Sequence, residues 1–357
     1  MPKSGILPFR FQGVFHKVEK KGVETVKIFA YCLREFDEKP MFDRLAGEFD
    51  AQYGYSTEYP CPDNVSLAAG YDAVSCTPCN MGADMLQRFY DVGVRYVATR
   101  SIGFDHIDLD KARQLGMGVC RVSYEPETVA DYAIMLMLMC CRNMPHIMNR
   151  SLVQDYSLQG KMGRDISDCT VGVVGAGQIG STVIRHLSGF GCKLLAYDPC
   201  VSPMAESPAE YVSLKELYAR SDIITLHTPA TAENYHMIDS RALQQMRDGV
   251  ILINTARGAL VDTDALIQGL ESGKVGHAAL DVLEDEAGLY YANRMGDVIA
   301  NRQMAVLRSF PNVILSPHTA FYTEKVVWNM AYKTFRGVRD MMEQSENPLI
   351  ILQGKRG

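Results

Sequence analysis

Short runs of β-branched and aromatic residues alternate with helical stretches along the first part of the chain. The run "VKIFAYC" at residues 26–32 leads into the polar stretch "LREFDEKP", as a strand does when it leaves a sheet through a turn into a helix. Three more such runs, each preceded by a helical stretch, are "DAVSC", "VRYVAT" and "GVCRV" at residues 72–76, 94–99 and 118–122. This alternation predicts a parallel sheet flanked by helices.

A second alternation of strands and helices occupies the rest of the chain. Its six strand-like runs are "CTVGVVGAG", "KLLAYDP", "DIITLHTP", "GVILINTARG", "HAALDVL" and "NVILSPH". Six strands of this kind make a complete doubly wound sheet. The amphipathic stretch at residues 323–344 is one helix more than that sheet needs, so we expect it to return to the first domain.

Two segments do not follow the alternation. Residues 126–144, "PETVADYAIMLMLMCCRNM", begin as a helix N-terminus prefers and are then apolar on nearly every face. They predict either a central core helix or a helix packed across a subunit interface, and the sequence does not choose between the two. Residues 1–22 show neither helical nor strand periodicity, so we interpret them as an extension.

Composition narrows the class of protein. The chain has 357 residues, 47% of them hydrophobic, which is more than one compact domain usually needs, so two domains are expected. A net charge of −6 without a basic cluster argues against a nucleic-acid surface. No apolar run approaches the ~20 residues of a membrane helix, and the N-terminus lacks a secretion signal. We therefore expect a soluble cytoplasmic protein that binds a small molecule.

The ten cysteines are irregularly spaced, which favours reduced thiols over a disulfide scaffold. Cys76 and Cys79, in "CTPC", form the one CxxC pair. Without a second pair or nearby histidines in the sequence, a loop with two incidental thiols is a simpler interpretation than a metal or redox site. We therefore predict no metal.

A glycine-rich turn predicts a dinucleotide site. Gly175, Gly177 and Gly180 stand in GxGxxG spacing between a β-branched strand and a helix, where the tight turn, the approach of a pyrophosphate and close helix packing each require glycine. The next strand ends at Asp198, where a carboxylate can accept hydrogen bonds from both ribose hydroxyls. That carboxylate would repel a 2′-phosphate and no arginine follows it, so NAD is favoured over NADP.

Three later strands end in residues that could carry chemistry. Ligands of doubly wound sheets bind beyond the carboxyl ends of the strands, where Arg257 and His318 are expected. Arginine binds carboxylates bidentately, and histidine can supply the proton that a reduced ketone needs, although a packed core imidazole is the alternative for His318. Spacing alone leaves open which carboxylate would orient the ring: Asp281, Glu284, Asp285 or Glu286.

At this point the residues resemble a known family, the D-isomer-specific 2-hydroxyacid dehydrogenases. The runs that carry the resemblance are "TRSIGFDHIDLDKARQLG", "VGVVGAGQIG", "INTARGALVDTDAL", "AALDVLEDE" and "SPHTAFYT", in the family's order. "HTAFYT" and the long segment before it are most similar to the D-lactate dehydrogenase branch, which includes the 2-hydroxyisocaproate, phenyllactate and vancomycin-resistance dehydrogenases.

The resemblance implies two Rossmann-like, doubly wound α/β domains with parallel sheets and a cleft between them. The flavodoxin-like substrate domain would comprise residues 1–124 and 322–357, and the NAD-binding domain residues 125–321. This division would explain the surplus C-terminal helix.

The resemblance also implies roles for individual residues. Arg257 would grip the 2-oxoacid, His318 would be the acid/base, and Glu286, five residues after Asp281, would be its carboxylate partner. Asp281 would lie on the nicotinamide side. The further cofactor contacts that it implies are Gly175, Gly177, Gln178, Ile179, Gly180, Asp198, Thr228, Pro229, Asn234, Thr255, Ala256 and Arg257.

Substrate contacts are implied in the same way. The matching positions are Ile102, Gly103, Tyr124, Arg257 and Phe321, although simple packing at a domain junction explains Tyr124 and Phe321 equally well. Where some pyruvate-reducing relatives carry a tyrosine, this chain offers Cys76 or Thr77. A smaller pocket wall would make 2-oxoisocaproate or phenylpyruvate as suitable as pyruvate.

The function implied is reduction of a 2-oxoacid to the D-2-hydroxyacid by hydride transfer from NADH, in a homodimer formed through residues 126–144. The alternative is an NAD(H)-sensing scaffold, because the fold family includes a corepressor that keeps the dinucleotide site. The complete set of Arg257, Glu286 and His318 favours the enzyme.

Overall fold

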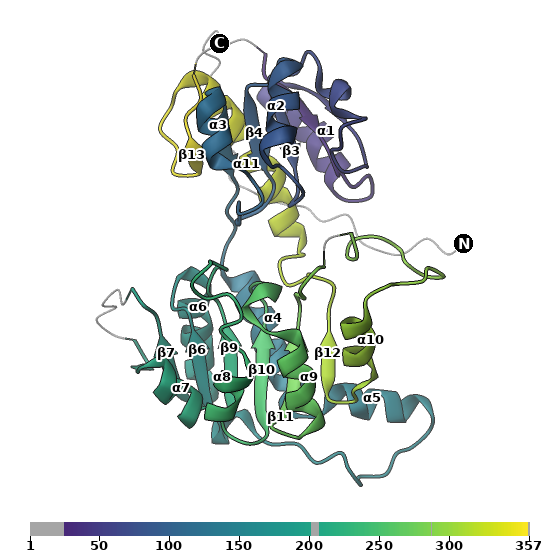
Figure 1. Ribbon diagram of the computed structural model, residues 1–357, viewed down its shortest axis with the longest axis vertical. Coiled ribbons are helices and arrows are strands. Elements are labelled where there is room, and N and C mark those ends of the chain that lie inside the picture. The colour runs from purple at the N-terminus through teal and green to yellow at the C-terminus, as the bar shows by residue number, and fades with distance from the viewer. Residues whose placement is uncertain (1–24, 201–206, 287, 356–357) are drawn as a thin grey trace. The chain divides into compact units, whose positions relative to one another are not determined.

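The computed structural model describes residues 25–200, 207–286 and 288–355, and these fall into two compact units. One unit comprises the described residues up to Ser123 together with those from Val327 onwards, and the other is Tyr124–Val326. Each unit has its own sheet, flanked by helices (Figure 1). The extension predicted at residues 1–22 lies outside the described residues.

The first unit contains, in its described part, a six-stranded sheet in the order β13-β5-β4-β3-β1-β2. Strands β1 to β5 are parallel, with Ala30 of β1 opposite Ser75 of β3, whereas β13 runs antiparallel to β5. The strands are β1 (Lys27–Ala30), β2 (Gln52–Tyr55), β3 (Ala73–Cys76), β4 (Tyr96–Thr99), β5 (Gly118–Arg121) and β13 (Ile350–Leu352). The four predicted strands are confirmed; β2 and β13, both at sheet edges, were not predicted.

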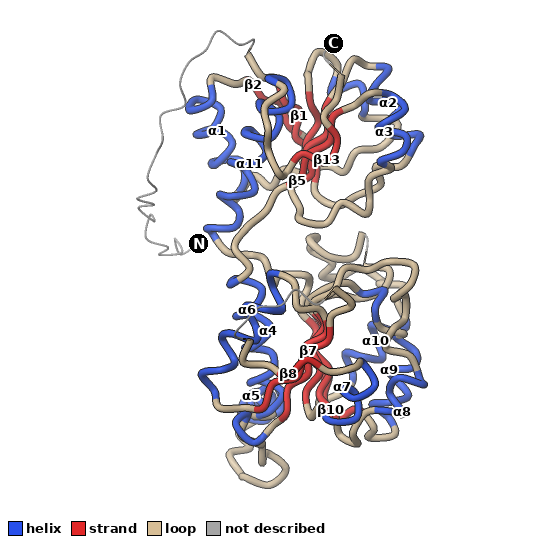
Figure 2. The backbone as a smooth tube through the Cα atoms, turned by 90° about the vertical axis from the view of Figure 1, so that its left-hand side faces the viewer, coloured by secondary structure: helices blue, strands red, loops and turns tan. Residues whose placement is uncertain are grey.

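Helices cover both faces of this sheet (Figure 2). On one face, Phe42 and Leu45 of α1 (Glu38–Phe49) pack with Phe335 and Val338 of α11 (Glu324–Glu343). This confirms that the C-terminal helix returns to the first sheet. The other face is covered by α2 (Ala83–Asp91), α3 (Leu109–Leu115) and the short 3₁₀ helix η1 (Val65–Ala68).

The second unit contains, among its described residues, a seven-stranded parallel sheet in the order β12-β11-β10-β9-β6-β7-β8. All six predicted strands are confirmed. The two-residue edge strand β8 was not predicted, because two residues give no periodic pattern. The strands are β6 (Thr170–Val174), β7 (Lys193–Tyr197), β8 (Glu210–Tyr211), β9 (Ile223–Leu226), β10 (Val250–Asn254), β11 (Val275–Leu280) and β12 (Val313–Leu315).

Seven α-helices of the described chain flank the second sheet. One face carries α4 (Glu127–Cys141), α5 (Met144–Leu152) and α6 (Gln178–Leu187) (Figure 2). The opposite face carries α7 (Leu214–Arg220), α8 (Ser240–Gln245), α9 (Thr263–Glu271) and α10 (Arg302–Ser309).

The apolar stretch predicted over residues 126–144 forms the core of this face. Its residues Ala130, Ala133 and Met137 are fully buried in a cluster with strands β6 and β10. The helix ends at Cys141 because Asn143 takes a left-handed conformation (φ +50°), and Pro145 then lies in the first turn of α5. The core-helix interpretation of α4 is therefore confirmed within one chain.

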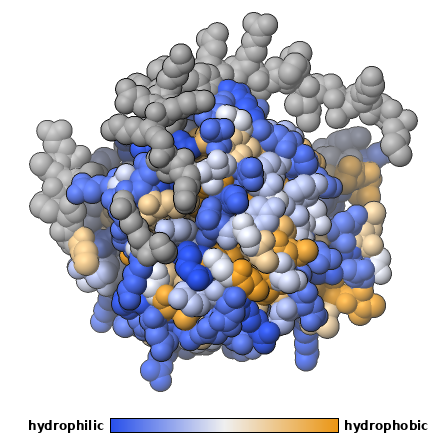
Figure 3. All heavy atoms as spheres, turned by 90° about the horizontal axis from the view of Figure 1, so that it is seen from above, coloured by the Kyte–Doolittle hydropathy of each residue, from blue (hydrophilic) through white to orange (hydrophobic). Residues whose placement is uncertain are grey.

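The outer surface is mixed in polarity. In the view of Figure 3 hydrophilic residues predominate and hydrophobic residues gather in smaller groups. Within the described part of the chain, no helix is both long enough and apolar enough to cross a bilayer.

Candidate active site

The turn between β6 and α6 is built from three glycines. Gly175 has φ +90°, and a Cβ on it would stand 2.8 Å from the carbonyl carbon of His227, so only glycine fits. A Cβ on Gly180 would stand 1.9 Å from the carbonyl oxygen of Gly175, so a side chain there would push the helix off its strand. Gly177 immediately precedes α6 and has open space around it. The N–H groups at the start of α6 can therefore be approached by a phosphate.

The carboxylate of Asp198, directly after β7, is fixed by two backbone donors. The N–H of Ala176 donates to Oδ2 at 2.7 Å, and the N–H of Cys200 donates to Oδ1 at 2.8 Å. Each carboxylate oxygen keeps a second acceptor site. The side chain is thus anchored to the glycine-rich turn and can still accept hydrogen bonds from a ribose.

The other predicted cofactor positions follow β9 and β10. The side chain of Asn234 closes residues 228–234 into a loop: it accepts from the N–H of Thr231 at 2.7 Å and donates to the carbonyl of Pro229 at 2.7 Å. Thr255 has a buried Oγ1 with no hydrogen-bond partner among the described residues. Buried hydroxyls are normally paired, so a ligand group at this sheet edge would supply the missing bond.

Arg257 lies in a tight turn after β10. Asn254, at the end of the strand, donates to the carbonyl of Arg257 at 2.8 Å and accepts from the N–H of Ala256 at 3.0 Å. A Cβ on Gly258 would stand 2.1 Å from the carbonyl carbon of Leu283, so this turn packs directly on the segment that leads to Glu286. The sequence did not point to Asn254, although a polar residue ending the apolar run "VILIN" was the available signal.

His318 lies three residues after β12 and contacts Glu286. Its Nδ1 stands 2.6 Å from Oε1 of Glu286, while Oε2 of Glu286 accepts from the N–H of Leu283 at 2.9 Å. Both side chains are about one quarter exposed, at 26% and 27%. The contact fixes the orientation of the ring and identifies Nδ1 as the nitrogen that faces the carboxylate. The core-imidazole alternative for His318 is therefore wrong.

The other three acidic candidates have different surroundings. Asp281 is fully buried, and its carboxylate accepts from the Ser316 hydroxyl at 2.6 Å and from the N–H groups of Thr319 and Ala320, each at 2.9 Å. It therefore shapes the segment that carries His318.

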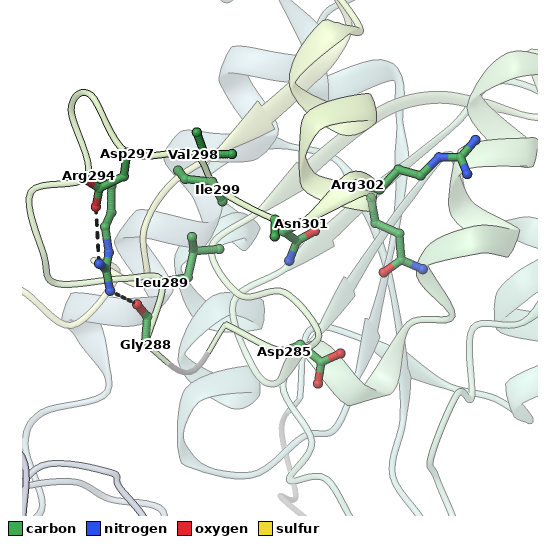
Figure 4. A pocket seen from close by; sticks show the side chains of 11 residues that line it. Asp285, Gly288, Leu289, Arg294, Asp297, Val298, Ile299, Asn301 and Arg302 are labelled. Atoms are coloured by element: carbon green, nitrogen blue, oxygen red, sulfur yellow. Dashed lines mark hydrogen bonds and ion pairs between the residues drawn. The ribbon is translucent and has the colours of Figure 1, made fainter.

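The carboxylate of Glu284 contacts other residues than those around His318. Its carboxylate accepts from the N–H and the hydroxyl of Thr263, at 3.0 and 2.6 Å, and stands 2.6 Å from Nε2 of His236. Asp285 lines a cavity of about 520 Å³ with residues of the segment between Gly288 and Gln303 (Figure 4). In that segment Arg294 reaches Asp297 and the carbonyl of Gly288. Arg257 and His318 do not line this cavity, so it is not the candidate active site.

Aromatic rings surround the imidazole. Phe321 lies edge-on to His318 and to Tyr291, with ring centroids 6.3 and 6.4 Å apart, and its centroid is 6.5 Å from that of Tyr124. The Tyr291 hydroxyl donates to the carbonyl of His318 at 3.0 Å. Burial raises the pKa of Tyr124 to about 12 despite the opposing effect of Arg257, so this phenol stays neutral. Tyr291 was not predicted, because its link to His318 spans 27 residues.

Ile102 and Gly103 belong to the first unit, in the loop after β4. The carbonyl of Ile102 accepts from Arg121 at 3.3 Å, and that of Gly103 accepts from the Ser101 hydroxyl at 2.6 Å. Both carbonyls are thus engaged within their own unit, and the role of the two amides stays a prediction.

Comparison with known proteins agrees with this geometry. The family model described as "D-isomer specific 2-hydroxyacid dehydrogenase, NAD binding domain" matches residues 134–320. The chain belongs to the D-isomer specific 2-hydroxyacid dehydrogenases. It is therefore an NAD-dependent oxidoreductase, and the glycine-rich turn, Asp198 and the unpaired Thr255 hydroxyl fit an NAD molecule.

Several members of this dehydrogenase family are similar over most of the chain. An aromatic 2-oxoacid reductase of Clostridium sporogenes is 40% identical over 325 residues, which cover 88% of this chain and 96% of the relative. A D-specific alpha-keto acid dehydrogenase of Enterococcus faecalis is 42% identical over 303 residues, or 85% and 93% of the two chains. The solved structure of a D-2-hydroxyisocaproate dehydrogenase aligns with a TM-score of 0.82 at 33% identity, covering 92% of this chain and all of that one.

Proposed function

We propose that this dehydrogenase reduces 2-oxoacids with a bulky apolar side chain to the D-2-hydroxyacids, with NADH as the reductant. The observation that carries the proposal is the 2.6 Å contact between His318 and Glu286, on a strand end of the same sheet as Arg257. Reduction of a ketone leaves an alkoxide that needs a proton, and a histidine held by a carboxylate is suited to supply it.

Each residue has one task in this proposal. The guanidinium of Arg257 binds the substrate carboxylate through paired hydrogen bonds. The hydride that the carbonyl carbon receives would come from NADH, when it is bound. Since Nδ1 of His318 faces Glu286, its Nε2 gives the proton to the carbonyl oxygen. Asp281 keeps the segment around His318 in place.

The preference for a bulky side chain rests on two observations. Phe321 and Tyr291 present aromatic rings beside His318, and such rings bind apolar and aromatic groups. The second comes from the resemblance: in the first unit, Cys76 or Thr77 would correspond to the tyrosine of some pyruvate-reducing relatives, and either side chain is smaller. The relative from C. sporogenes is named for aromatic 2-oxoacids, which agrees with this preference.

A substrate panel tests the proposal. We expect kcat/KM with NADH to be highest for phenylpyruvate or 2-oxoisocaproate, lower for 2-oxobutyrate and pyruvate, and lowest for oxaloacetate, with D products by chiral analysis. Replacing His318 by Ala should lower kcat by about 10² to 10⁴ without weakening NADH binding, because a positioned acid contributes that much. A value for pyruvate far above the others would overturn the bulky-substrate preference, and an active His318→Ala protein would overturn the role of His318.

The scaffold alternative is not favoured. Nothing in nucleotide sensing alone requires the paired His318 and Glu286 at the same sheet edge as Arg257. Binding of NADH without turnover of any acid in the panel would nevertheless revive it.

We also propose a cytoplasmic homodimer. Apolar side chains stay exposed on α5 and in the segment after it, most of all Leu152, Tyr156, Leu158 and Met162, at 82%, 76%, 89% and 89%. A run of this kind is typical of a surface that a second subunit covers. All ten cysteines, each among the described residues, are free thiols, which suits a reducing compartment.

A further inference from the structure

Three cysteine side chains of the first unit converge at the carboxyl ends of β1 and β3. Cys76 is the last residue of β3, and Cys32 follows β1 by two residues. The N–H of Tyr31 donates to the carbonyl of Ser75 at 2.8 Å, which extends the pairing of these strands up to the cysteines. All three side chains belong to one apolar cluster, in which Cys32 and Cys76 are buried and Cys79 packs against the buried members. No local pattern in the sequence indicated the third thiol, because Cys32 is 44 residues away from Cys76.

The three thiols differ in access to solvent. Cys76 and Cys32 are 1% and 8% exposed, whereas Cys79 is only half-buried. An oxidant in solution therefore meets Cys79 first. Its sulfur is then the one that an internal thiol must reach to form a disulfide.

The surroundings favour the thiolate form of the buried partner. The guanidinium of Arg100, 1% exposed, donates to the carbonyl of Cys32 at 3.1 Å and to the hydroxyl of Ser75 at 3.1 Å. The contact with Cys79, with a smaller contribution from His106, lowers the pKa of Cys76 to about 5 against the effect of burial. The contacts with Cys32 and Cys76 raise the pKa of Cys79. Cys76 is thus the more nucleophilic sulfur and Cys79 the more accessible one.

The loop between the two cysteines is short and anchored at both ends. The carbonyl of Cys76 accepts from the N–H of Arg100 at 2.7 Å, while the N–H of Met81 donates to the carbonyl of His106 at 3.2 Å. Residues 77–80 are therefore the part that can move when a bond forms. In the described part of the chain, no cluster of three or more possible metal ligands is arranged to hold an ion.

We propose that Cys76 and Cys79 form a reversible disulfide on exposure to hydrogen peroxide, and that this bond reshapes the loop carrying Thr77. After Cys79 loses its proton, peroxide oxidises the thiolate of Cys79 to a sulfenic acid, and one water leaves. The sulfur of Cys76 then attacks the sulfenic sulfur, the S–O bond breaks, and a second water leaves as the S–S bond forms. A dithiol reductant reverses the bond by thiol–disulfide exchange and is itself oxidised to its disulfide.

The test is a map of the thiols. The reduced full-length protein is treated with hydrogen peroxide, alkylated and digested with trypsin, which cuts after Lys27, Arg34, Arg44 and Arg88. Cys76 and Cys79 then share one peptide with Cys61, and Cys32 lies in another. We expect the shared peptide to lose the mass of two hydrogen atoms, with only Cys61 alkylated, and dithiothreitol to restore the other two thiols.

Variants separate the pair from general oxidation. Cys79→Ser should abolish the bond, and Cys61→Ser, in the same peptide, should leave it intact. Oxidation of the exposed Cys200 while Cys76 and Cys79 remain alkylatable would overturn the proposal, as would a bond between Cys79 and Cys32. If Cys79→Ser fails to fold, Cys79→Ala serves in its place.

The effect on the loop has its own readout, which rests on the proposed function. Oxidation should change KM for the 2-oxoacid several-fold in the wild type and in Cys61→Ser, reversibly, and should leave KM for NADH unchanged. A disulfide that forms without any change in KM for the 2-oxoacid would overturn the role of the loop. The peptide map is unaffected if the substrate assignment itself fails.

Discussion

Neighbouring residues hold both the backbone and the side chain of His318 in one conformation. Its backbone is left-handed (φ +52°), a conformation that costs free energy for a residue with a side chain. The carbonyl of Asp281 accepts its N–H, Glu286 holds Nδ1, and the hydroxyl of Tyr291 donates to its carbonyl. Backbone and side chain are therefore both fixed before any substrate arrives.

Replacing Tyr291 by Phe tests this support. Loss of one hydrogen bond, about 1 kcal/mol, should lower kcat about fivefold while KM for NADH stays unchanged. Replacing Tyr291 by Leu should additionally reduce the ratio of kcat/KM for phenylpyruvate to that for pyruvate, because the ring is removed. The control is Tyr156→Phe, an exposed tyrosine after α5. Equal kinetics in Tyr291→Phe and wild type would show that the hydroxyl does not position His318.

Asp198 is expected to set the choice of cofactor. Its carboxylate, fixed by Ala176 and Cys200, would accept from the ribose hydroxyls of NAD and repel the phosphate of NADP. Asp198→Ala should therefore lower the ratio of kcat/KM for NADH to that for NADPH by about 10- to 100-fold. Asp168→Ala, at an exposed position of the same unit, is the control. An unchanged ratio would contradict the assignment.

For single residues, the sequence predicted which side chains belong to the candidate site better than it predicted the groups that they contact. Arg257 and His318 end apolar strands, and that position alone brings them to one sheet edge. The choice among four carboxylates depends on how the segment after β11 folds back, with Leu283 against Gly258, and no local pattern encodes such a contact. Asn254 and Tyr291 were missed for the same reason.

In the segment that follows β11, neighbouring acidic residues contact different parts of the second unit. Glu284 joins it to Thr263 at the start of α9 and to His236, and Glu286 joins it to His318. Glu284 thus holds this segment against the start of α9 and His236, two residues before Glu286. We call these contacts of Glu284 the latch. The register of this segment, and with it the position of Glu286, depends on that latch.

The latch predicts a pH dependence of stability. Burial raises the pKa of Glu284, but the hydrogen bonds from Thr263 and the contact with His236 outweigh it and hold the pKa below the usual value. The carboxylate is therefore favoured in the folded chain. Its contribution is complete above the unfolded pKa, about 4.3, and disappears as the pH falls through the lower folded pKa.

Glu284→Gln should accordingly lower the free energy of unfolding by about 1 kcal/mol at pH 7, with a smaller difference from wild type below pH about 4. Urea unfolding at both pH values measures this difference. Glu271→Gln, on the exposed end of α9, is the control. A difference independent of pH would show that the charge of Glu284 does not act as a latch.

The elements that the sequence missed are short and at sheet edges. Strands β8 and β13 have two and three residues, and β13 is only half-buried, so neither shows the alternation by which a strand is recognised. The longer strands in the middle of each sheet are buried on both faces and show as apolar runs. Hydrophobic patterning therefore predicted the centre of each sheet and the edge strand β12, but not the edge strands β2, β8 and β13.

At the scale of the whole molecule, residues 126–144 were interpreted either as a core helix or as a helix at a subunit interface. Helices α4 and α5 differ in which of these interpretations they fit. Helix α4 is largely buried within its own unit, whereas α5 has no buried residue. In the proposed dimer, the surface for the second subunit would therefore lie on α5 and residues 153–162, next to the segment first predicted for it.

Substitution on this surface tests the proposed dimer. Leu158→Lys places one charge from each subunit in the interface. The lost hydrophobic burial reduces the free energy of association by about 1.5–3 kcal/mol per side chain, which should raise the dimer Kd at least about 100-fold. Sedimentation velocity across a concentration series would measure it. Val298→Lys, also a highly exposed apolar side chain of this unit, should leave the dimer intact. A Leu158→Lys protein that sediments like wild type would place the interface elsewhere.

The discontinuity of the first unit has a consequence for the order of folding during synthesis. Its sheet needs β13 beside β5, and its core needs Phe335 and Val338 from α11, yet these follow the whole second unit in the chain. The second unit is contiguous and can complete its core as soon as Val326 has left the ribosome. The first unit, although synthesised first, must wait with an open sheet edge and an uncovered apolar face until the last residues arrive.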